Sequence, residues 1–215
     1  MKEHPILFSG PMVRAILEGR KTMTRRVVKP QPEWRYMAGL FGSWVFKGGL
    51  LYPNAKPDVL ALCPYGQPGD RLWVRETWQY FGFSDEGEPC ICYLADHGRE
   101  WPHVPQPEAD KVDCIWADLS DPGNFSISGR ACDNRWRPSI HMPHWANRIT
   151  LEITGVRLDR LQDISVDDAW SEGIPHSPDV NPIHEFEGLW TSINGDRSWN
   201  ANPWVWVVEF KRIAP

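Results

Sequence analysis

Alternating apolar and polar residues predict strands near both ends of this chain, with amphipathic helices beside them. A short strand over residues 5–8 precedes a helix over residues 11–18, whose apolar positions recur at helical spacing. Gly19 follows this helix, at a position where glycine adopts the left-handed conformation without strain. Residues 22–28 then alternate as a second strand, so the chain opens with a strand, a helix and a strand.

The C-terminal third has the same regularity. Residues 148–156 alternate as a strand. Ser165 is the expected N-cap of a helix that ends at Gly173, with Asp168 in the place of the capping-box glutamate. The remaining predicted elements are a helix over residues 183–193 and a last strand over residues 204–210.

Between these regions the pattern is less regular. Residues 44–46 and 50–52 predict a hairpin, and a Pro-Gly-Asp turn at residues 68–70 introduces an alternating strand. From about residue 81 to residue 134 no period is sustained. This stretch is predicted to be an irregular insertion with one or two short strands.

The composition favours a loop-rich β architecture within one domain. The 215 residues fit a single sizeable domain, or a small one that carries a long insertion. The 13 tryptophans, 20 prolines and 17 glycines favour short strands joined by loops. We therefore predict an α+β fold: one domain over residues 1–215, with flanking helices and the insertion at about 81–134.

The charge pattern marks the segment GRKTMTRR, residues 19–26. The chain carries a net charge of −5, which argues against a protein that coats polyanions. Residues 14–29 nevertheless hold six basic residues and one acid, Glu18. A small basic patch on an acidic chain suits one bound phosphate or nucleotide better than long tracts of DNA.

Four features in this order resemble the ASCH family, one branch of the PUA-like small β-barrels. They are a helix ending in ILEGRKT, a Pro-Gly-Asp turn before a strand, a helix ending in Ser171-Glu172-Gly173-Ile174, and a terminal VVEF strand. The resemblance covers roughly the first 80 and the last 80 residues, and chains with the PSIHMP segment are similar to long forms from bacteriophages and prophages. It implies a PUA-like mixed β-barrel of five or six strands, with a cleft lined by the GRKT turn.

The resemblance also implies an activity. PUA-like relatives bind RNA or a flipped, modified base in such clefts, and small bacterial ASCH proteins are amidohydrolases that remove the acetyl group from N4-acetylcytidine. Their catalytic lysine and threonine, in a GRKTxT motif, and their glutamate on the later helix correspond here to Lys21, Thr24 and Glu172. We expect hydrolysis of N4-acetylcytidine to cytidine and acetate. The alternatives are a non-catalytic RNA or modified-base binding module and a ribonuclease.

These residue types can carry amide hydrolysis. Thr24 could attack the acyl carbonyl if Lys21 were neutral enough to accept its proton. A lysine ordinarily titrates near ~10.4, so this requires burial or nearby positive charge. Glu172 could orient Lys21 or protonate the leaving amine; alternatively, it activates water directly and Thr24 only binds the substrate. A solvated basic corner and an ordinary strand threonine are the structural alternatives.

The predicted substrate-binding residues come from two parts of the sequence. Those in the GRKTMTRR segment are Arg20, Thr22, Arg25 and Arg26. Those elsewhere are Arg75, Glu76, His141, Trp145 and Arg148. Trp145 could stack on a base, and the alternative for it and His141 is packing within a loop.

No metal or cofactor is predicted. His141 and His144 lie three residues apart with no third ligand nearby, which is a weak metal signal. Four of the five cysteines fall in the insertion at spacings that match no standard zinc site: Cys90, Cys92, Cys114 and Cys132. Buried single cysteines are therefore favoured over a structural zinc site.

The expected partner is a modified nucleoside, RNA or single-stranded nucleic acid. No apolar run approaches the length of a membrane span, and the N-terminus lacks a signal-peptide core. We therefore expect a cytoplasmic protein without a membrane partner, located in the bacterial host if a phage encodes it. A monomer is favoured, although the sequence does not set the oligomeric state.

Overall fold

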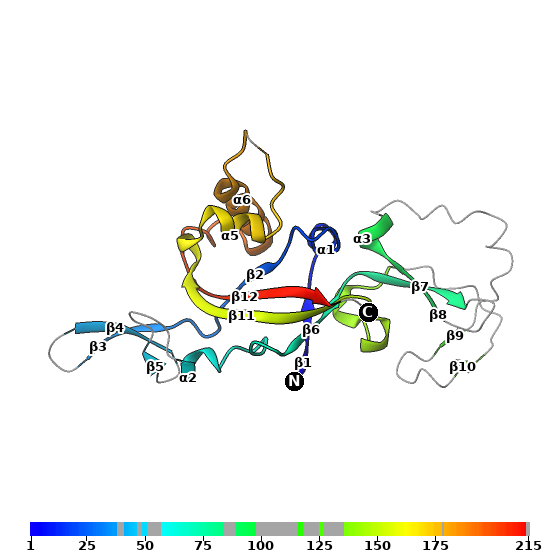
Figure 1. The fold of residues 1–215 in the computed structure, drawn as a ribbon, viewed down its shortest axis with the longest axis horizontal. Coiled ribbons are helices and arrows are strands. Elements are labelled where there is room, and N and C mark those ends of the chain that lie inside the picture. Colours follow the sequence, from blue (N-terminus) through cyan, green and yellow to red (C-terminus); the bar gives the residue numbers. More distant parts are fainter. Residues whose placement is uncertain are drawn as a thin grey trace. The chain divides into compact units, whose positions relative to one another are not determined.

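The computed structural model describes residues 1–37, 41–46, 49–50, 57–83, 89–97, 116–117, 125–126, 136–177 and 179–213. Its strands form one five-stranded sheet, one three-stranded sheet and two two-stranded sheets, with short helices between them (Figure 1). The fold class is therefore α+β, as the sequence predicts.

The five-stranded sheet has the order β1-β6-β11-β12-β2. Its strands are β1 (Glu3–Leu7), β2 (Met23–Val27), β6 (Arg71–Arg75), β11 (Thr150–Arg160) and β12 (Trp204–Ile213). The smaller sheets pair β3 (Glu33–Met37), β4 (Phe41–Phe46) and β5 (Gly49–Leu50), β7 (Trp78–Phe83) with β8 (Pro89–Tyr93), and β9 (Trp116–Ala117) with β10 (Phe125–Ser126). The α-helices are α1 (Gly10–Leu17), α2 (Pro57–Leu60), α3 (Leu94–His97), α5 (Val166–Ser171) and α6 (Pro182–Asn194). Single 3-10 turns are η1 (Ser139–His141), η2 (His144–Ala146) and η3 (Leu161–Asp163).

The chain divides into two compact units. The first unit comprises Met1–Pro5, Ala15–Trp73 and Ile149–Pro215, and the second comprises Ile6–Arg14 and Val74–Arg148. The predicted insertion falls within the second unit. Its described parts contain the end of β7, β8, β9, β10 and α3, which is more regular structure than the sequence predicts.

The pairing of β11 with β12 dominates the five-stranded sheet. The two strands are antiparallel from Thr150 opposite Ile213 to Arg160 opposite Trp204, with a bulge between Ile153 and Gly155. The bulge lets β11 continue to Arg160, past the end at residue 156 that the alternation predicts. On its other side β12 pairs with β2. The described pairings leave β1 and β2 as the edges of an open sheet, so they do not form the closed barrel that the resemblance implies.

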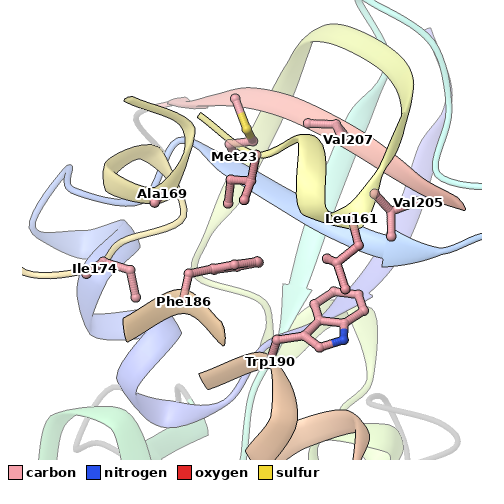
Figure 2. Packing of buried hydrophobic residues seen from close by; sticks show 9 residues of the cluster. Met23, Leu161, Ala169, Ile174, Phe186, Trp190, Val205 and Val207 are labelled. Carbon is pink, nitrogen blue, oxygen red and sulfur yellow. The ribbon is translucent and has the colours of Figure 1, made fainter. Parts of the chain in front are cut away.

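One apolar cluster holds α5 and α6 against the strands of the first unit. Figure 2 shows Phe186 and Trp190 of α6 beside Met23 of β2 and Val205 and Val207 of β12, all of them buried. Burying a side chain of this size contributes about 1.5–3 kcal/mol. The cluster therefore fixes the position of α5, the helix that the sequence marks for the site.

The helix ends agree with the capping residues that the sequence marks. The Asp168 amide donates to Ser165 Oγ at 3.1 Å at the start of α5, and Gly173 follows that helix with φ +95°. Gly19, after α1, has φ +76°. The Ile183 amide donates to the Asn181 side chain at the start of α6. The Ser165 contact and the two glycine conformations confirm the predicted ends of α1 and α5, whereas the Asn181 cap of α6 is not predicted from the sequence.

Three local details differ from the sequence predictions or lie beyond what can be compared. Strand β3 is not predicted, although its first four residues alternate charged and aromatic side chains. The segment after residue 138 forms η1 and η2, whereas no regular element is predicted for it above. Leu51 and Tyr52, predicted to close a hairpin, lie outside the described residues. Among the helices that the structure describes, none has the length and apolarity needed to cross a membrane.

Candidate functional site

Main-chain hydrogen bonds join the GRKTMTRR segment to the C-terminal end of α5. The Thr22 amide donates to the Ser171 carbonyl at 2.9 Å, and Lys21 forms an isolated antiparallel bridge with Glu172. On its other side the Thr22 carbonyl accepts from the Phe210 amide of β12 at 2.8 Å. The turn is therefore held by both a helix end and strand β12, and two segments 151 residues apart become neighbours.

The side chains of Lys21 and Glu172 form a buried ion pair. Lys21 Nζ donates to Glu172 Oε2 at 2.7 Å and to the Glu172 carbonyl at 2.8 Å. The lysine side chain is 0% exposed and the glutamate side chain 4%. Gly173 makes room for the pair, because a Cβ at this position would lie 3.0 Å from Lys21 Cβ. The structure thus brings together two of the three predicted catalytic residues.

The second carboxylate oxygen of Glu172 faces Arg25. Arg25 Nη1 lies 3.3 Å from Glu172 Oε1, and its Nη2 lies 2.5 Å from Asp168 Oδ2. The arginine side chain is fully buried and its guanidinium lies 5.9 Å from the ring centre of Phe186. Asp168 and Glu172 are four residues apart around α5, so both carboxylates point toward β2.

Asp168 is held from a second side by Arg157 of β11. Arg157 Nη2 lies 2.6 Å from the same Asp168 Oδ2 that Arg25 contacts. Arg157 is itself anchored by Asp159 Oδ2 at 2.7 Å and by Glu209 Oε1. We refer to Lys21, Arg25, Arg157, Asp168 and Glu172 as the Lys21 cluster.

Burial makes the lysine of this cluster easier to deprotonate. Desolvation lowers the pKa of Lys21; Glu172 opposes this, and the charges of Arg26 and Arg25 add to it. Asp168, the carboxylate of the cluster nearest to solvent, keeps its charge more readily than an isolated aspartate does. Partial burial raises the pKa of Asp168, but Arg157 and Arg25 outweigh this effect and hold that pKa below its usual value. The cluster therefore combines a fixed anion with an amine that can lose its proton.

Arg26 and Tyr65 act on the same neighbourhood. Burial lowers the pKa of Arg26, and the charges of Tyr65 and Glu172 oppose that shift. Burial also raises the pKa of Tyr65, against the charge of Arg26. The sequence predicts Arg26 as a binding residue, whereas no sequence pattern marks Tyr65.

The other predicted residues of this segment have different surroundings. Thr24 is buried in β2 opposite Val208 and, by strand alternation, faces away from the side that carries Arg25. Arg20 donates to the Gly173 carbonyl at 2.7 Å and pairs with Glu18, so its side chain fastens the turn. Thr22 is exposed.

The second unit contains its own ion pair, in which the buried Glu76 meets the half-buried Arg148. Arg148 Nε and Nη2 lie 2.8 and 2.9 Å from the two oxygens of Glu76, whose side chain is 1% exposed. The same guanidinium contacts Asp96 at 2.6 Å and lies 3.9 Å from the ring centre of Tyr93. We call these four residues the Arg148 cluster. Burial lowers the pKa of Arg148, but the hydrogen bonds to Glu76 and Asp96 outweigh burial, so that the pKa is raised.

The remaining predicted binding residues also lie in the second unit. Arg75 donates twice to the Met142 carbonyl, at 3.1 and 3.0 Å, which is a structural contact. Trp145 packs edge-on against Trp78, with ring centres 6.1 Å apart, and His141 is exposed. These placements leave the predicted binding roles of the five residues in this unit as predictions.

Within the described ranges, no group of three or more His, Cys, Asp or Glu side chains is placed to hold a metal ion. Cys92 is half-buried. Cys114, Cys132 and the side chain of Cys90 lie outside what the structure describes, so the zinc alternative stays a prediction. Cys63, in the first unit, is buried, and this raises the pKa of its thiol to about 11.

Two members of the Lys21 cluster were missed as site residues. Asp168 is predicted only as a capping residue, although its spacing of four from Glu172 is a signal that the two carboxylates share a helix face. Arg157 lies beyond the predicted end of its strand, so its partner could not be inferred.

Comparisons with protein-family models, with curated proteins and with solved structures give no match to this chain. The chemistry of the site therefore follows from its own residues. A buried amine held against a carboxylate can accept a proton, transfer it and be restored, as general acid–base catalysis requires.

Proposed function

We propose that this chain is a PUA-like domain of the ASCH type that hydrolyses the N-acyl amide of a modified cytidine, converting N4-acetylcytidine to cytidine and acetate. One observation carries the proposal: Lys21 Nζ lies 2.7 Å from Glu172 Oε2. The resemblance selects these two residues from segments 151 positions apart, without reference to any contact between them. Their pairing supports the assignment of both as one catalytic unit.

In the proposed reaction, neutral Lys21 accepts a proton from a water molecule that adds to the acetyl carbonyl. The resulting ammonium is held by Glu172 and returns the proton to N4 of the base as the C–N bond breaks, leaving cytidine and acetic acid. Arg26, whose charge acts on Lys21, would stabilise the oxyanion of the tetrahedral intermediate. The lowered pKa of Lys21 supports its role as the base.

The proposal assigns Thr24 to substrate binding. By strand alternation Thr24 shares a face of β2 with Arg26, so we assign Thr24 to binding beside the proposed oxyanion-stabilising residue and take water as the nucleophile. Thr22 and Arg26 complete the binding surface proposed for the first unit.

The test is to incubate the purified protein with N4-acetylcytidine and to measure cytidine and acetate by chromatography. Lys21→Met should abolish cytidine release, because the acceptor of the proton is lost. Lys211→Met is the matched control, since that lysine side chain is 62% exposed and its pair with Glu152 is a surface contact. Turnover that survives Lys21→Met would rule out this mechanism.

Loss of folding must be separated from loss of chemistry. Lys21→Met leaves the Glu172 carboxylate buried with Arg25 as its remaining ionic contact, and breaking such a pair destabilises by about 3–5 kcal/mol. The double variant Lys21→Met/Glu172→Leu removes both charges and keeps the contact of Arg25 with Asp168. It should fold and release no cytidine.

A second function is favoured by the same burial. The Lys21 and Glu172 side chains are enclosed and already paired, as in a cluster that only stiffens the turn of a nucleic-acid reader. A reader would bind oligonucleotides with an affinity that falls as salt rises, and would form no product. Salt-dependent binding without cytidine release would favour this reading, and shortening of RNA would instead identify a ribonuclease.

A further inference from the structure

We infer that Arg25 is a positioning residue for the Lys21–Glu172 pair, and that Asp168 sets how strongly Arg25 draws on the Glu172 carboxylate. The inference deepens the proposed function and rests on it for the chemical meaning of the pair. Arg25, predicted to bind substrate, is instead assigned to hold the Glu172 carboxylate that pairs with Lys21. Asp168, predicted only as a cap, is also given a part in the chemistry.

The two oxygens of Glu172 are divided between two cations. Oε2 accepts a hydrogen bond from Lys21 Nζ at 2.7 Å, and Oε1 contacts Arg25 Nη1 at the longer distance of 3.3 Å. The shorter contact of Arg25, at 2.5 Å, goes to Asp168. Asp168 thus keeps part of the guanidinium charge away from Glu172, which leaves Glu172 available to Lys21.

Arg25 is placed to act through Glu172 and not on a substrate. Both of its terminal nitrogens face protein groups: Nη1 faces Glu172 Oε1 and lies 3.4 Å from the Met23 sulfur, and Nη2 faces Asp168 Oδ2. The ring of Phe186 packs against the same guanidinium. Asp168 is fixed in turn by Arg157, which bonds the same Oδ2. The position of Arg25 between the two carboxylates is therefore set from both sides.

The charged groups around Lys21 come from four elements. They are Arg25 and Arg26 of β2, Glu172 and Asp168 of α5 and its C-cap, Arg157 and Asp159 of β11, and Glu209 of β12, with Tyr65 beside Arg26. A cation next to an amine favours the neutral amine, so loss of Arg25 should raise the pKa of Lys21. Loss of Asp168 should lower it, because Arg25 then turns fully to Glu172 and competes with Lys21. If the two variants only loosened the packing around Lys21, its pKa would not shift up in one variant and down in the other.

The experiment follows the side-chain signal of Lys21 by NMR in the full-length protein with 13C-labelled lysine. The signal is assigned by its absence in Lys21→Met/Glu172→Leu. Arg25→Gln should raise the apparent pKa of Lys21 by about 1 unit, and Asp168→Asn should lower it by about 1 unit. Asp167→Asn is the matched control, since Asp167 is exposed in the same helical turn, and Arg197→Gln changes an exposed arginine. Neither control should move the Lys21 signal.

The double variant Arg25→Gln/Asp168→Asn tests whether Asp168 acts through Arg25. In the Arg25→Gln background, Asp168→Asn should cause no further shift. Shifts of the same sign in both single variants would overturn the inference, and so would a shift from Asp168→Asn that persists without Arg25. If Arg25→Gln does not fold, Arg25→Met replaces it, because methionine suits the neighbourhood of Met23 and Phe186.

Cytidine release measured against pH on the same variants separates this inference from the proposed function. The acid limb of the kcat profile should move with the pKa of Lys21 in each variant. Opposite shifts of the Lys21 signal, with no cytidine from any variant, would overturn the proposed function and leave the positioning role standing. Cytidine release with an unmoved Lys21 signal would overturn the positioning role alone.

Discussion

The Lys21 cluster of the first unit and the Arg148 cluster of the second unit use similar charges for different results. Each pairs a cation with a glutamate that is almost fully buried, and each adds an aspartate nearer to solvent. In the Arg148 cluster a planar guanidinium meets both oxygens of Glu76. In the Lys21 cluster a primary amine meets one oxygen of Glu172, and Arg25 takes the other.

The difference lies in the type of cation and in its burial, since the Lys21 side chain is 0% exposed and the Arg148 side chain 25%. A guanidinium stays protonated in proteins, so the Arg148 cluster is fixed in charge and binds its carboxylates as a clamp. An amine loses its proton more readily when it is desolvated, so the Lys21 cluster can change its charge within a folded protein. An ion pair with a buried carboxylate can therefore serve either to stabilise the fold or to transfer protons, and the type of cation determines which of the two is possible.

The largest effect is expected when the Arg148 cluster loses its arginine. Arg148→Met leaves Glu76 buried without its bidentate partner, and this should lower the free energy of unfolding by about 3–5 kcal/mol in urea titrations. Adding Glu76→Leu should recover most of the loss, because both charges are then gone. Arg35→Met is the control, since its pair with Glu33 is exposed and contributes less than about 1 kcal/mol. A loss as small as that of the control would show that the clamp is not structural.

The next effect is expected where the Lys21 cluster meets the backbone. Gly173→Ala places a Cβ 3.0 Å from Lys21 Cβ at a residue with φ +95°, and should destabilise by about 2–3 kcal/mol. Gly19→Ala has a similar φ of +76° but no atom within 4 Å of the new Cβ, and should lose only about 1 kcal/mol. Thermal unfolding of both variants measures the difference. Equal losses would mean that Lys21 is not packed tightly against Gly173.

A smaller effect separates the two clusters by pH. Because the pKa of Lys21 is lowered from 10.5 in the folded state, the unfolded chain binds more protons between the lowered value and 10.5. Stability should therefore rise with pH through this window, by at most about 1.4 kcal/mol per pH unit, relative to Lys21→Met/Glu172→Leu. Arg148→Met/Glu76→Leu should keep that rise, since both of its changes lie in the other cluster. Urea titrations from about pH 7 to about pH 10 measure it; a stability difference that stays constant would contradict a titrating lysine.

The smallest effect concerns the helix that carries Asp168 and Glu172. Ser165→Ala removes the acceptor for the Asp168 amide and should lower the free energy of unfolding by about 1 kcal/mol. Ser192→Ala, at an exposed position in α6, is the control and should change stability by less than about 0.5 kcal/mol. Chemical denaturation of the two variants compares them. Equal stability would show that the cap does not support the cluster.

Local patterns in the sequence predicted most elements of the first unit. Capping residues and helical spacing marked α5 and α6, and the left-handed glycines marked the ends of α1 and α5. The alternation predicted for residues 22–28 also accounts for the contact of Arg25 Nη1 with the Met23 sulfur at 3.4 Å, since residues two apart in a strand share a face. These features depend on neighbours within a few residues, which a sequence displays directly.

The partners across the sheet could not be predicted in the same way. A bulge between Ile153 and Gly155 shifts the register of β11 against β12 just before Arg157, which contacts Asp168. The glycine is a local signal for a bulge, but it does not indicate which residue of another element Arg157 will meet. The pairing of Lys21 with Glu172 came from the resemblance and not from local pattern. Long-range pairing depends on how strands are ordered in space, and that order is not encoded in any single segment.

The central claim is that Lys21 is a titrating base within a buried pair. The most direct test compares two curves for the wild-type protein: the rate of cytidine release from N4-acetylcytidine against pH, and the NMR titration of the Lys21 side chain. The rate should rise with pH, and its midpoint should coincide with the pKa of Lys21. A rate that is independent of pH across that titration, or a midpoint that differs clearly from it, would contradict the account.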